Sequence, residues 1–286
     1  MTIKEAKMFK THAEQLAILK ERELFIENDD EALSLLKRIN YYRLTGYMLF
    51  MKKNDTFFPG SSLQHAIRMY RFDEKLRRIL LGAIEYIEIS LKAQVAYSFA
   101  ETHGPLGYYK SENFVFPETH RKFLKNIEEK IVTSKELFVL HHRKEYGSNL
   151  PLWVAVELFT FGMLSKFFKN MKTEDKKVIS KDLFDVIPGV LTKWLQALTI
   201  LRNTCAHYSR VYNKKFSAGG VNLPKDLRGS LNKDKLAAFV YILKKMLPET
   251  EWNRFFHEFN VLVEAFDDVV KYEHMGFYEG WQDHIN

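Results

Sequence analysis

The 286-residue chain is 46% hydrophobic and 14% aromatic, which excludes a disordered polymer and suffices for one large core or two smaller ones. Its formal net charge of +7 is a mild excess that favours a polyanionic partner without requiring one. The single cysteine, Cys205, excludes an intrachain disulfide and any zinc site with two or more cysteine ligands.

The beginning of the sequence, MTIKEAKMFKTHAEQ, lacks the apolar core of a secretory signal. No stretch approaches the roughly 18 uncharged apolar residues that a membrane-spanning helix needs. We therefore expect a soluble cytoplasmic protein that does not contact a membrane, and the lone cysteine fits a reducing compartment.

Apolar residues recur at spacings of three and four along most of the chain, which predicts an all-α fold. We expect helices over residues 4–26, 30–40, 62–101, 117–132, 135–145, 151–171, 173–184, 232–246 and 249–271. The segment 62–101 forms one helix or two, with Gly82 as its weak point. No run alternates well enough to form a sheet. Residues 1–60 are expected to form a helical cap packed on a main domain of residues 61–286.

A polar cluster ends an apolar segment near residue 200, in the sequence LRNTCAHYSRVYN. One helix over residues 190–212 would turn an apolar stripe toward the core, made of Trp194, Leu198, Leu201, Cys205 and Tyr208. The same helix would turn a second set away from that stripe, made of Arg202, Asn203, Ala206, His207 and Arg210. The core packing of this helix therefore does not explain its polar residues.

The polar set contains the side chains that phosphate chemistry needs. Arginine offers a planar fork of donors to phosphate oxygens, and histidine exchanges protons near neutral pH. Asn203 can hold the imidazole ring or contact a phosphate oxygen. A base and a cation are enough to cleave RNA through its 2′-hydroxyl without a metal. From the residues alone, a structural network, a metal site and a phosphate-handling active site remain open.

The motif Arg202-Asn203-x-x-Ala206-His207 resembles the R-x4–6-H motif of HEPN-domain ribonucleases. Further blocks resemble, in the expected order, the Abi-like abortive-infection proteins of the AbiD/AbiF type. These blocks are LKRINYYRLTGY at 36–47, YRFDEKLR at 70–77 running into IEYIE at 84–88, PLWVAVELFTFG at 151–162 and GFYEGW at 276–281. Family members often have proline where this chain has Tyr278, far from the motif in sequence. The resemblance extends from about residue 10 to 282.

The resemblance implies an all-helical HEPN-like bundle with additional N-terminal and C-terminal helices. It also implies a metal-independent RNA endonuclease of bacterial phage defence, with Arg202 and His207 as catalytic residues oriented by Asn203. HEPN nucleases usually pair two motifs and this chain has one, so a homodimer is expected. RNA is the expected substrate, a regulatory RNA or an antitoxin is a candidate partner, and no cofactor is expected. The alternative is a non-catalytic RNA-binding or regulatory protein of a defence or toxin–antitoxin-like system.

Other residues are candidates for holding RNA or for supporting the motif. Single-stranded RNA is held by positively charged side chains together with aromatic rings on which bases stack. By this criterion the candidates are Arg210, Tyr208, Arg43, Tyr42 and Arg71. A solvated basic face is the alternative explanation for any one of them. A carboxylate can orient a catalytic histidine through a hydrogen bond, or it can pair with a nearby cation. The candidates for either role are Glu85, Glu88 and Glu157. Glu157 lies in an apolar run and is expected to be buried. His141 and Glu145 have metal-ligand spacing, but two ligands are too few and no metal site is expected.

Overall fold

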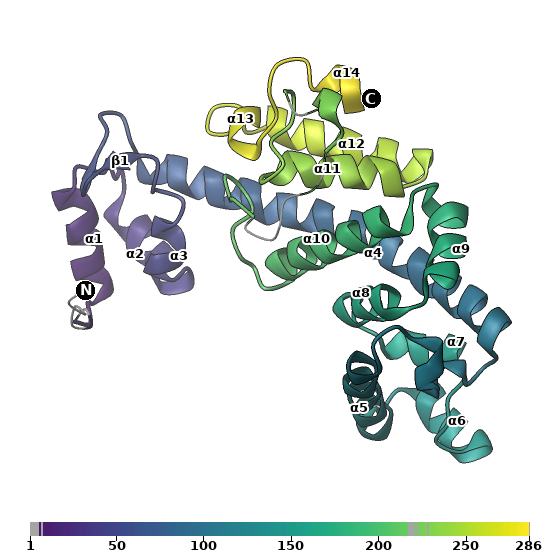
Figure 1. Ribbon diagram of the computed structural model, residues 1–286. Coiled ribbons are helices and arrows are strands. Elements are labelled where there is room, and N and C mark those ends of the chain that lie inside the picture. The colour runs from purple at the N-terminus through teal and green to yellow at the C-terminus, as the bar shows by residue number, and fades with distance from the viewer. Residues whose placement is uncertain (1–5, 7, 217–220, 222, 228, 286) are drawn as a thin grey trace. The chain divides into compact units, whose positions relative to one another are not determined.

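The computed structural model describes residues 6, 8–216, 221, 223–227 and 229–285, and almost all of their regular structure is helical (Figure 1). This confirms the predicted all-α fold. The chain divides into two compact units. The N-terminal unit comprises residues 1–76 and 259–271, and the motif unit comprises residues 77–258 and 272–286. How the expected cap of residues 1–60 packs on the rest of the chain stays a prediction.

The N-terminal unit begins with short helices and a two-stranded hairpin that no alternating pattern predicted. Its elements are α1 (His12–Glu21), α2 (Asp29–Arg38), α3 (Tyr41–Thr45), β1 (Lys52–Lys53), β2 (Thr56–Phe57) and the first part of α4 (Leu63–His103). Their shared core consists of buried aliphatic and aromatic side chains, among them Leu16, Leu19, Leu36, Leu44, Met48 and Phe57.

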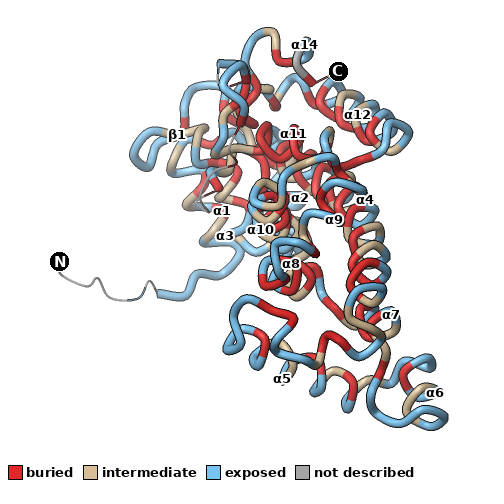
Figure 2. Tube along the Cα trace, turned by 45° about the vertical axis from the view of Figure 1, so that its right-hand side comes forward, coloured by how far each residue is buried: buried red, intermediate tan, exposed pale blue. Residues whose placement is uncertain are grey.

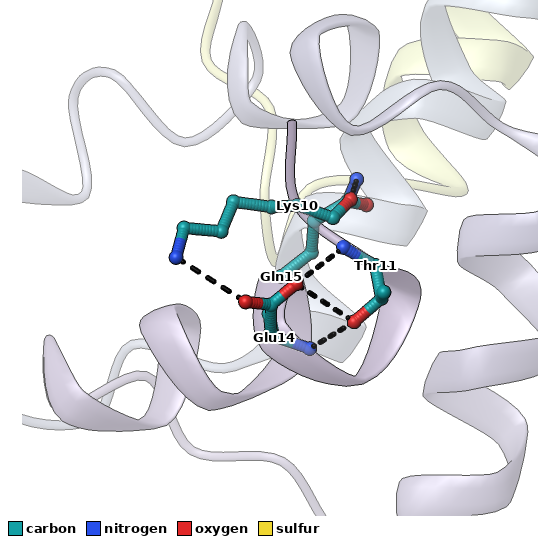
Figure 3. Close-up of polar contacts among 4 residues, drawn as sticks. All are labelled: Lys10, Thr11, Glu14 and Gln15. Carbon is teal, nitrogen blue, oxygen red and sulfur yellow. Dashed lines mark hydrogen bonds and ion pairs between the residues drawn. The ribbon is translucent and has the colours of Figure 1, made fainter. Parts of the chain in front are cut away.

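A capping box sets the first residue of α1 (Figure 3). The Thr11 hydroxyl accepts a hydrogen bond from the Glu14 amide at 3.2 Å, and the Glu14 carboxylate accepts one from the Thr11 amide at 2.7 Å. These bonds satisfy two amides that a helix start would otherwise leave unpaired. The expectation of a helix from residue 4 was therefore wrong for the described residues before His12, while residues 4, 5 and 7 lie outside the described part of the chain.

The segment 259–271 packs on the beginning of α4 within the N-terminal unit. The Arg68 guanidinium donates to both carboxylate oxygens of Asp268 at 2.6 Å, and these hydrogen bonds lower the pKa of that carboxyl group. Beside this pair, the Phe72 ring meets the Phe266 ring edge-on at 5.8 Å between centroids. Residues about 200 positions apart in the sequence thus pack in the same core.

The motif unit is built from the rest of α4 and a series of shorter helices. The α-helices that follow are α5 (Pro117–Thr133), α6 (Leu137–Tyr146), α7 (Leu152–Ala155), α8 (Phe161–Asn170), α9 (Thr173–Phe184), α10 (Pro188–Ala206), α11 (Leu236–Met246), α12 (Glu249–Glu264), α13 (Tyr272–Met275) and α14 (Gln282–Ile285). The last residues of α12, from Phe259 onward, belong to the N-terminal unit. Short 3₁₀ turns lie at Gly107–Tyr109 (η1), Ser111–Asn113 (η2), Val156–Leu158 (η3) and Lys225–Leu227 (η4). Helix α10 packs on α8, α9 and α11 (Figure 1).

The structure decides the expectations for two helices, over residues 62–101 and 151–171. Helix α4 is continuous, because Gly82 keeps its helical conformation, and buried positions alternate with exposed ones along it (Figure 2). The single helix expected over 151–171 was wrong. The chain leaves the helix at Phe159, and the Thr160 hydroxyl accepts from the Met163 amide at 3.3 Å to begin α8.

Among the described helices, none is long and apolar enough by itself to cross a bilayer. Helices α9 and α10 reach that length and composition only as a pair, and a bend of 72° separates them.

Gly276 permits a close approach between α13 and the beginning of α11, which makes it a test of this packing. Its φ is +92°, and an added Cβ would lie 2.6 Å from the Lys235 Cβ. We expect Gly276→Ala to lower the free energy of unfolding by about 1–3 kcal/mol. Gly82→Ala is the matched control, because nothing lies within 4 Å of its added Cβ, and it should raise that free energy by about 0.5–1 kcal/mol. Urea unfolding measures both, and equal effects would contradict the packing described.

Candidate active site

Helix α10 carries the motif and is held in the core of the motif unit by its apolar face. Trp194, Leu198, Leu201 and Cys205 are buried, which confirms that part of the predicted stripe. The Trp194 ring meets the Tyr241 ring of α11 edge-on at 6.2 Å between centroids. On the side of α8, the helices come close enough that a Cβ at Gly162 would lie 3.5 Å from the Thr199 methyl group. The helix therefore gives the motif a rigid support.

Helix α10 ends at Ala206, six residues before the expected end at 212. The Tyr208 amide donates to the Cys205 carbonyl at 3.0 Å, and the Ser209 amide donates to the Thr204 carbonyl at 2.9 Å. This pair of bonds is a Schellman cap, which reverses the chain through one residue of left-handed conformation. Tyr208 is that residue, with φ of 57°, and its side chain is 67% exposed. The expectation that Tyr208 faces the core was wrong, because the helix ends before it.

Tyr208 is an unusual residue for this conformation. Glycine occupies most left-handed caps, since a Cβ clashes with the following carbonyl at a cost of about 1–2 kcal/mol. Strained backbone of this kind concentrates at functional sites, where the surrounding structure maintains it. The result here is an exposed aromatic ring directly after His207.

The motif side chains gather at this solvent-facing end of α10. Asn203 and His207 are exposed, and Arg202 is half-buried. The Arg202 guanidinium donates a long hydrogen bond of 3.5 Å to the Asn203 amide oxygen. Within the part of the chain that the structure describes, the His207 imidazole makes no hydrogen bond. Asn203 therefore contacts the guanidinium in this structure. Arg202, Asn203 and His207 lie off the buried face of α10 as predicted, whereas Arg210 lies beyond the end of the helix, so the prediction for its face does not apply.

The chain after the motif is anchored to the C-terminal part of the motif unit. Val211 and Tyr212 are buried, and the Tyr212 hydroxyl lies 2.6 Å from the His274 Nδ1 atom. The Lys235 ammonium donates to the Asn213 side-chain oxygen at 3.2 Å and to the His274 carbonyl at 3.1 Å. Arg210, which lies between the turn and this anchored segment, is half-buried.

Lys214 is a cation near the motif that the sequence analysis did not select. Its ammonium donates to the buried Thr204 hydroxyl at 3.4 Å and lies 5.4 Å above the centre of the Phe216 ring. Thr204 follows Asn203 directly, so Lys214 adds positive charge beside the motif. Its only signal in the sequence is a lysine pair at 214–215, and the turn at Tyr208 is what returns it to α10.

The predicted supporting carboxylates are engaged elsewhere or exposed. Glu88 and Glu157 both approach the Lys92 ammonium, at 3.7 and 3.9 Å. The Glu157 side chain is 57% exposed, so its expected burial was wrong, because the helix break at residues 159–160 leaves it on the surface. Glu85 is exposed and makes no hydrogen bond or ion pair with a described residue. Over the described ranges, none of the three forms a hydrogen bond or ion pair with the side chain of Arg202 or His207.

The remaining RNA-binding candidates lie in the N-terminal unit, whereas the motif lies in the motif unit. Tyr42, Arg43 and Arg71 are all exposed. Two other cations of α4 have partners within that unit: Arg68 pairs with Asp268, and the Lys75 ammonium lies 5.9 Å from the centre of the Phe266 ring.

No group of three or more histidine, cysteine, aspartate or glutamate side chains with metal-site geometry occurs among the described residues. The pair singled out on α6 has other neighbours. The His141 ring meets the Tyr146 ring at 6.3 Å between centroids, and Glu145 lies 3.5 Å from the Lys144 ammonium.

A family model described as Abi-like protein matches residues 34–213, more than half of the chain. The chain belongs to the family of Abi-like proteins. Membership suggests a part in abortive infection, a defence against phage. No curated protein and no solved structure matches the chain.

The matched residues of this Abi-like protein include the entire motif and end at Asn213, just after the reversal of the chain. They also include Tyr42, Arg43 and Arg71 of the N-terminal unit. The block at 276–281 lies outside the matched residues, so its assignment to the family pattern stays a prediction.

The left-handed turn at Tyr208 can be tested through stability. Tyr208→Gly and Tyr208→Ala both remove the ring, but only glycine removes the Cβ that strains this conformation. We expect the glycine variant to exceed the alanine variant by about 1 kcal/mol in free energy of unfolding. Guanidinium unfolding of both variants measures this difference. An alanine variant as stable as the glycine variant would show that the turn does not have the described geometry.

Proposed function

We propose that this Abi-like protein is an endoribonuclease of phage defence, with Arg202 and His207 as its catalytic residues. The observation that carries the proposal is the grouping of Arg202, Asn203 and His207 at the solvent-facing end of α10. A rigid helix positions these side chains, none is needed for the core, and Lys214 and Arg210 follow beside them. A guanidinium and an accessible imidazole are the groups that metal-independent RNA cleavage uses.

The proposed reaction begins when the His207 imidazole takes the proton of a ribose 2′-hydroxyl. The 2′-oxygen then forms a bond to the adjacent phosphorus, while the Arg202 guanidinium stabilises the charge on the phosphate oxygens. The bond from phosphorus to the 5′-oxygen breaks, and an acid protonates that oxygen. The products are a 2′,3′-cyclic phosphate and a 5′-hydroxyl end.

Substitution of the two catalytic residues tests this proposal directly. We expect His207→Ala to slow RNA cleavage by roughly 10²–10⁴-fold, because it removes the acid–base group. Arg202→Ala should also abolish detectable cleavage and any growth arrest on overexpression. Both variants should keep the circular dichroism of the native protein, since neither side chain is buried. Initial rates on a labelled single-stranded RNA provide the measurement.

Matched controls are available on exposed helix surfaces away from α10. His257→Ala in α12 and Arg121→Ala in α5 remove the same side-chain types and should cleave at the native rate. The native protein should remain active in excess EDTA, yield 2′,3′-cyclic phosphate ends and leave DNA intact. Native rates in both motif variants would refute the catalytic assignment. Specific RNA binding without cleavage by the native protein would favour the non-catalytic RNA-binding alternative.

We further propose that the working unit is a homodimer in which the ends of two α10 helices share one cleft. One motif supplies one histidine, which cannot easily act on both sides of the phosphorus as base and acid. Ala206 is small and half-buried at the helix end, so it permits close approach of a second copy. Such two-fold contacts are the commonest form of self-association. The facing guanidiniums would repel, so RNA or phosphate should tighten the dimer.

Mixed dimers test whether the site is shared between copies. One chain would be native and the other would carry both Arg202→Ala and His207→Ala, with different affinity tags for purification. A shared site should lose most of its activity in the mixed dimer, whereas two independent sites would retain half. Light scattering at micromolar concentration checks the stoichiometry. A fully active monomer would contradict the shared site even if the protein cleaves RNA.

A further inference from the structure

The N-terminal unit contains a cavity of about 920 Å³, and none of the described residues that line it belongs to the motif. Its walls come from α1, from α2 and α3, and from the hairpin of β1 and β2, all within one unit. A volume of several hundred to about a thousand Å³ is typical of pockets that bind small organic ligands.

The described lining of this cavity is strongly cationic. Its lysine and arginine residues are Lys10, Arg22, Lys37, Arg38 and Lys52, and its only carboxylate is Asp55. Arg22 and Lys52 share that single carboxylate, at 3.5 and 3.2 Å. Lys10 pairs at 3.3 Å with Glu14, outside the lining (Figure 3). One carboxylate shared by two cations leaves an excess of positive charge that suits an anionic ligand.

Lys37 and Arg38 are the cations best placed to meet such a ligand. They are adjacent at the end of α2, both are exposed, and neither forms an ion pair with a described residue. An arginine fork and a lysine ammonium that line one cavity both offer donors to the oxygens of a phosphate group.

Two tyrosines line the same cavity next to these cations in the sequence. Tyr42 is 76% exposed, and its amide donates to the Asn40 side-chain oxygen at 2.8 Å, which fixes the backbone at the beginning of α3. Tyr41 is half-buried, and burial raises the pKa of its hydroxyl, so it remains a neutral hydrogen-bond donor at neutral pH. An exposed aromatic ring held near cations is the arrangement on which nucleobases stack.

Gln15 adds an unpaired acceptor to the lining of the cavity. Its side-chain nitrogen donates to the Lys10 carbonyl at 2.9 Å. Its side-chain oxygen is buried and has no hydrogen-bond partner among the described residues. Buried acceptors are normally paired, and an N–H group of a nucleobase entering the cavity would supply the missing donor.

We propose that this cavity binds a nucleotide, with the phosphate against Lys37 and Arg38 and the base against Tyr42. The same chemistry is offered by a free nucleotide and by the 5′-phosphorylated end of an RNA chain. The proposed site is independent of the motif on α10, so it holds a ligand whether or not the protein cleaves RNA.

Calorimetric titration of the full-length His207→Ala protein tests this binding without interference from RNA cleavage. We expect adenosine 5′-monophosphate to bind, and adenosine or inorganic phosphate alone to bind at least tenfold more weakly. The double variant Lys37→Glu/Arg38→Glu should weaken binding of the nucleotide at least tenfold. Tyr42→Ala should weaken it roughly 5- to 100-fold, while Tyr42→Phe retains the stacking ring and the affinity.

Lys53→Glu, tested beside Lys37→Glu, is the matched control for charge. Lys53 is exposed in β1 of the same unit and does not line the cavity, so its variant should bind within about twofold of the parent, whereas Lys37→Glu should weaken binding more. Equal weakening by Lys53→Glu and Lys37→Glu would overturn the proposed site. So would phosphate binding as tightly as the nucleotide, or no binding of any nucleotide probe.

Short RNAs identify the source of the nucleotide. Tighter binding of a 5′-phosphorylated pentanucleotide than of its 5′-hydroxyl form, lost in Lys37→Glu/Arg38→Glu, would assign the cavity to an RNA end. Binding of adenosine 5′-monophosphate that the pentanucleotide does not displace would assign it to a free nucleotide. Both results support the site, and neither depends on whether the native protein is a ribonuclease.

Discussion

The hydrogen bonds that end α10 fix the point at which the chain reverses, and the geometry of the motif depends on that point. Two amides donate backward to the Thr204 and Cys205 carbonyls, so the chain turns through Tyr208 and the helix stops directly before His207. Had the helix continued, Tyr208 would have packed in the core and Lys214 would have lain far from Thr204. The reversal instead gathers a histidine, an aromatic ring and several cations at one exposed helix end.

Such a reversal needs support on both sides. Before the turn, α10 packs on α8 and α11, and its buried face includes Trp194 and Leu198. After the turn, Tyr212 meets His274 and Asn213 meets Lys235. These contacts hold the exit of the turn on the C-terminal helices, and they explain how a bulky residue keeps a left-handed conformation. The proposed reaction, which uses one imidazole and one guanidinium, would benefit from such rigidity, because small displacements of catalytic groups reduce rates severely.

Positive charge is arranged differently in the two units. At the end of α10, arginine, histidine and lysine side chains surround an exposed helix end. In the N-terminal unit, lysine and arginine side chains line a cavity whose size suits a single nucleotide. The net charge of +7 is mild although each unit has a cationic surface. Acidic residues elsewhere in each unit, such as Asp268 and Glu157, offset the positive charge in the sum.

The sequence by itself determined the all-α class, most helix positions, the buried face of α10 from Trp194 to Cys205, and the solvent-facing side of Arg202, Asn203 and His207. These features follow from a periodicity of 3.6 residues, which is a local property. Only the tertiary structure decided that α10 stops at Ala206, because no glycine marks the turn and the contacts that maintain it come from residues 235 and 274. The same holds for the exposure of Glu157 and for the cavity of the N-terminal unit. Their surroundings are created by packing between segments that are separate in the sequence, which local patterns do not encode.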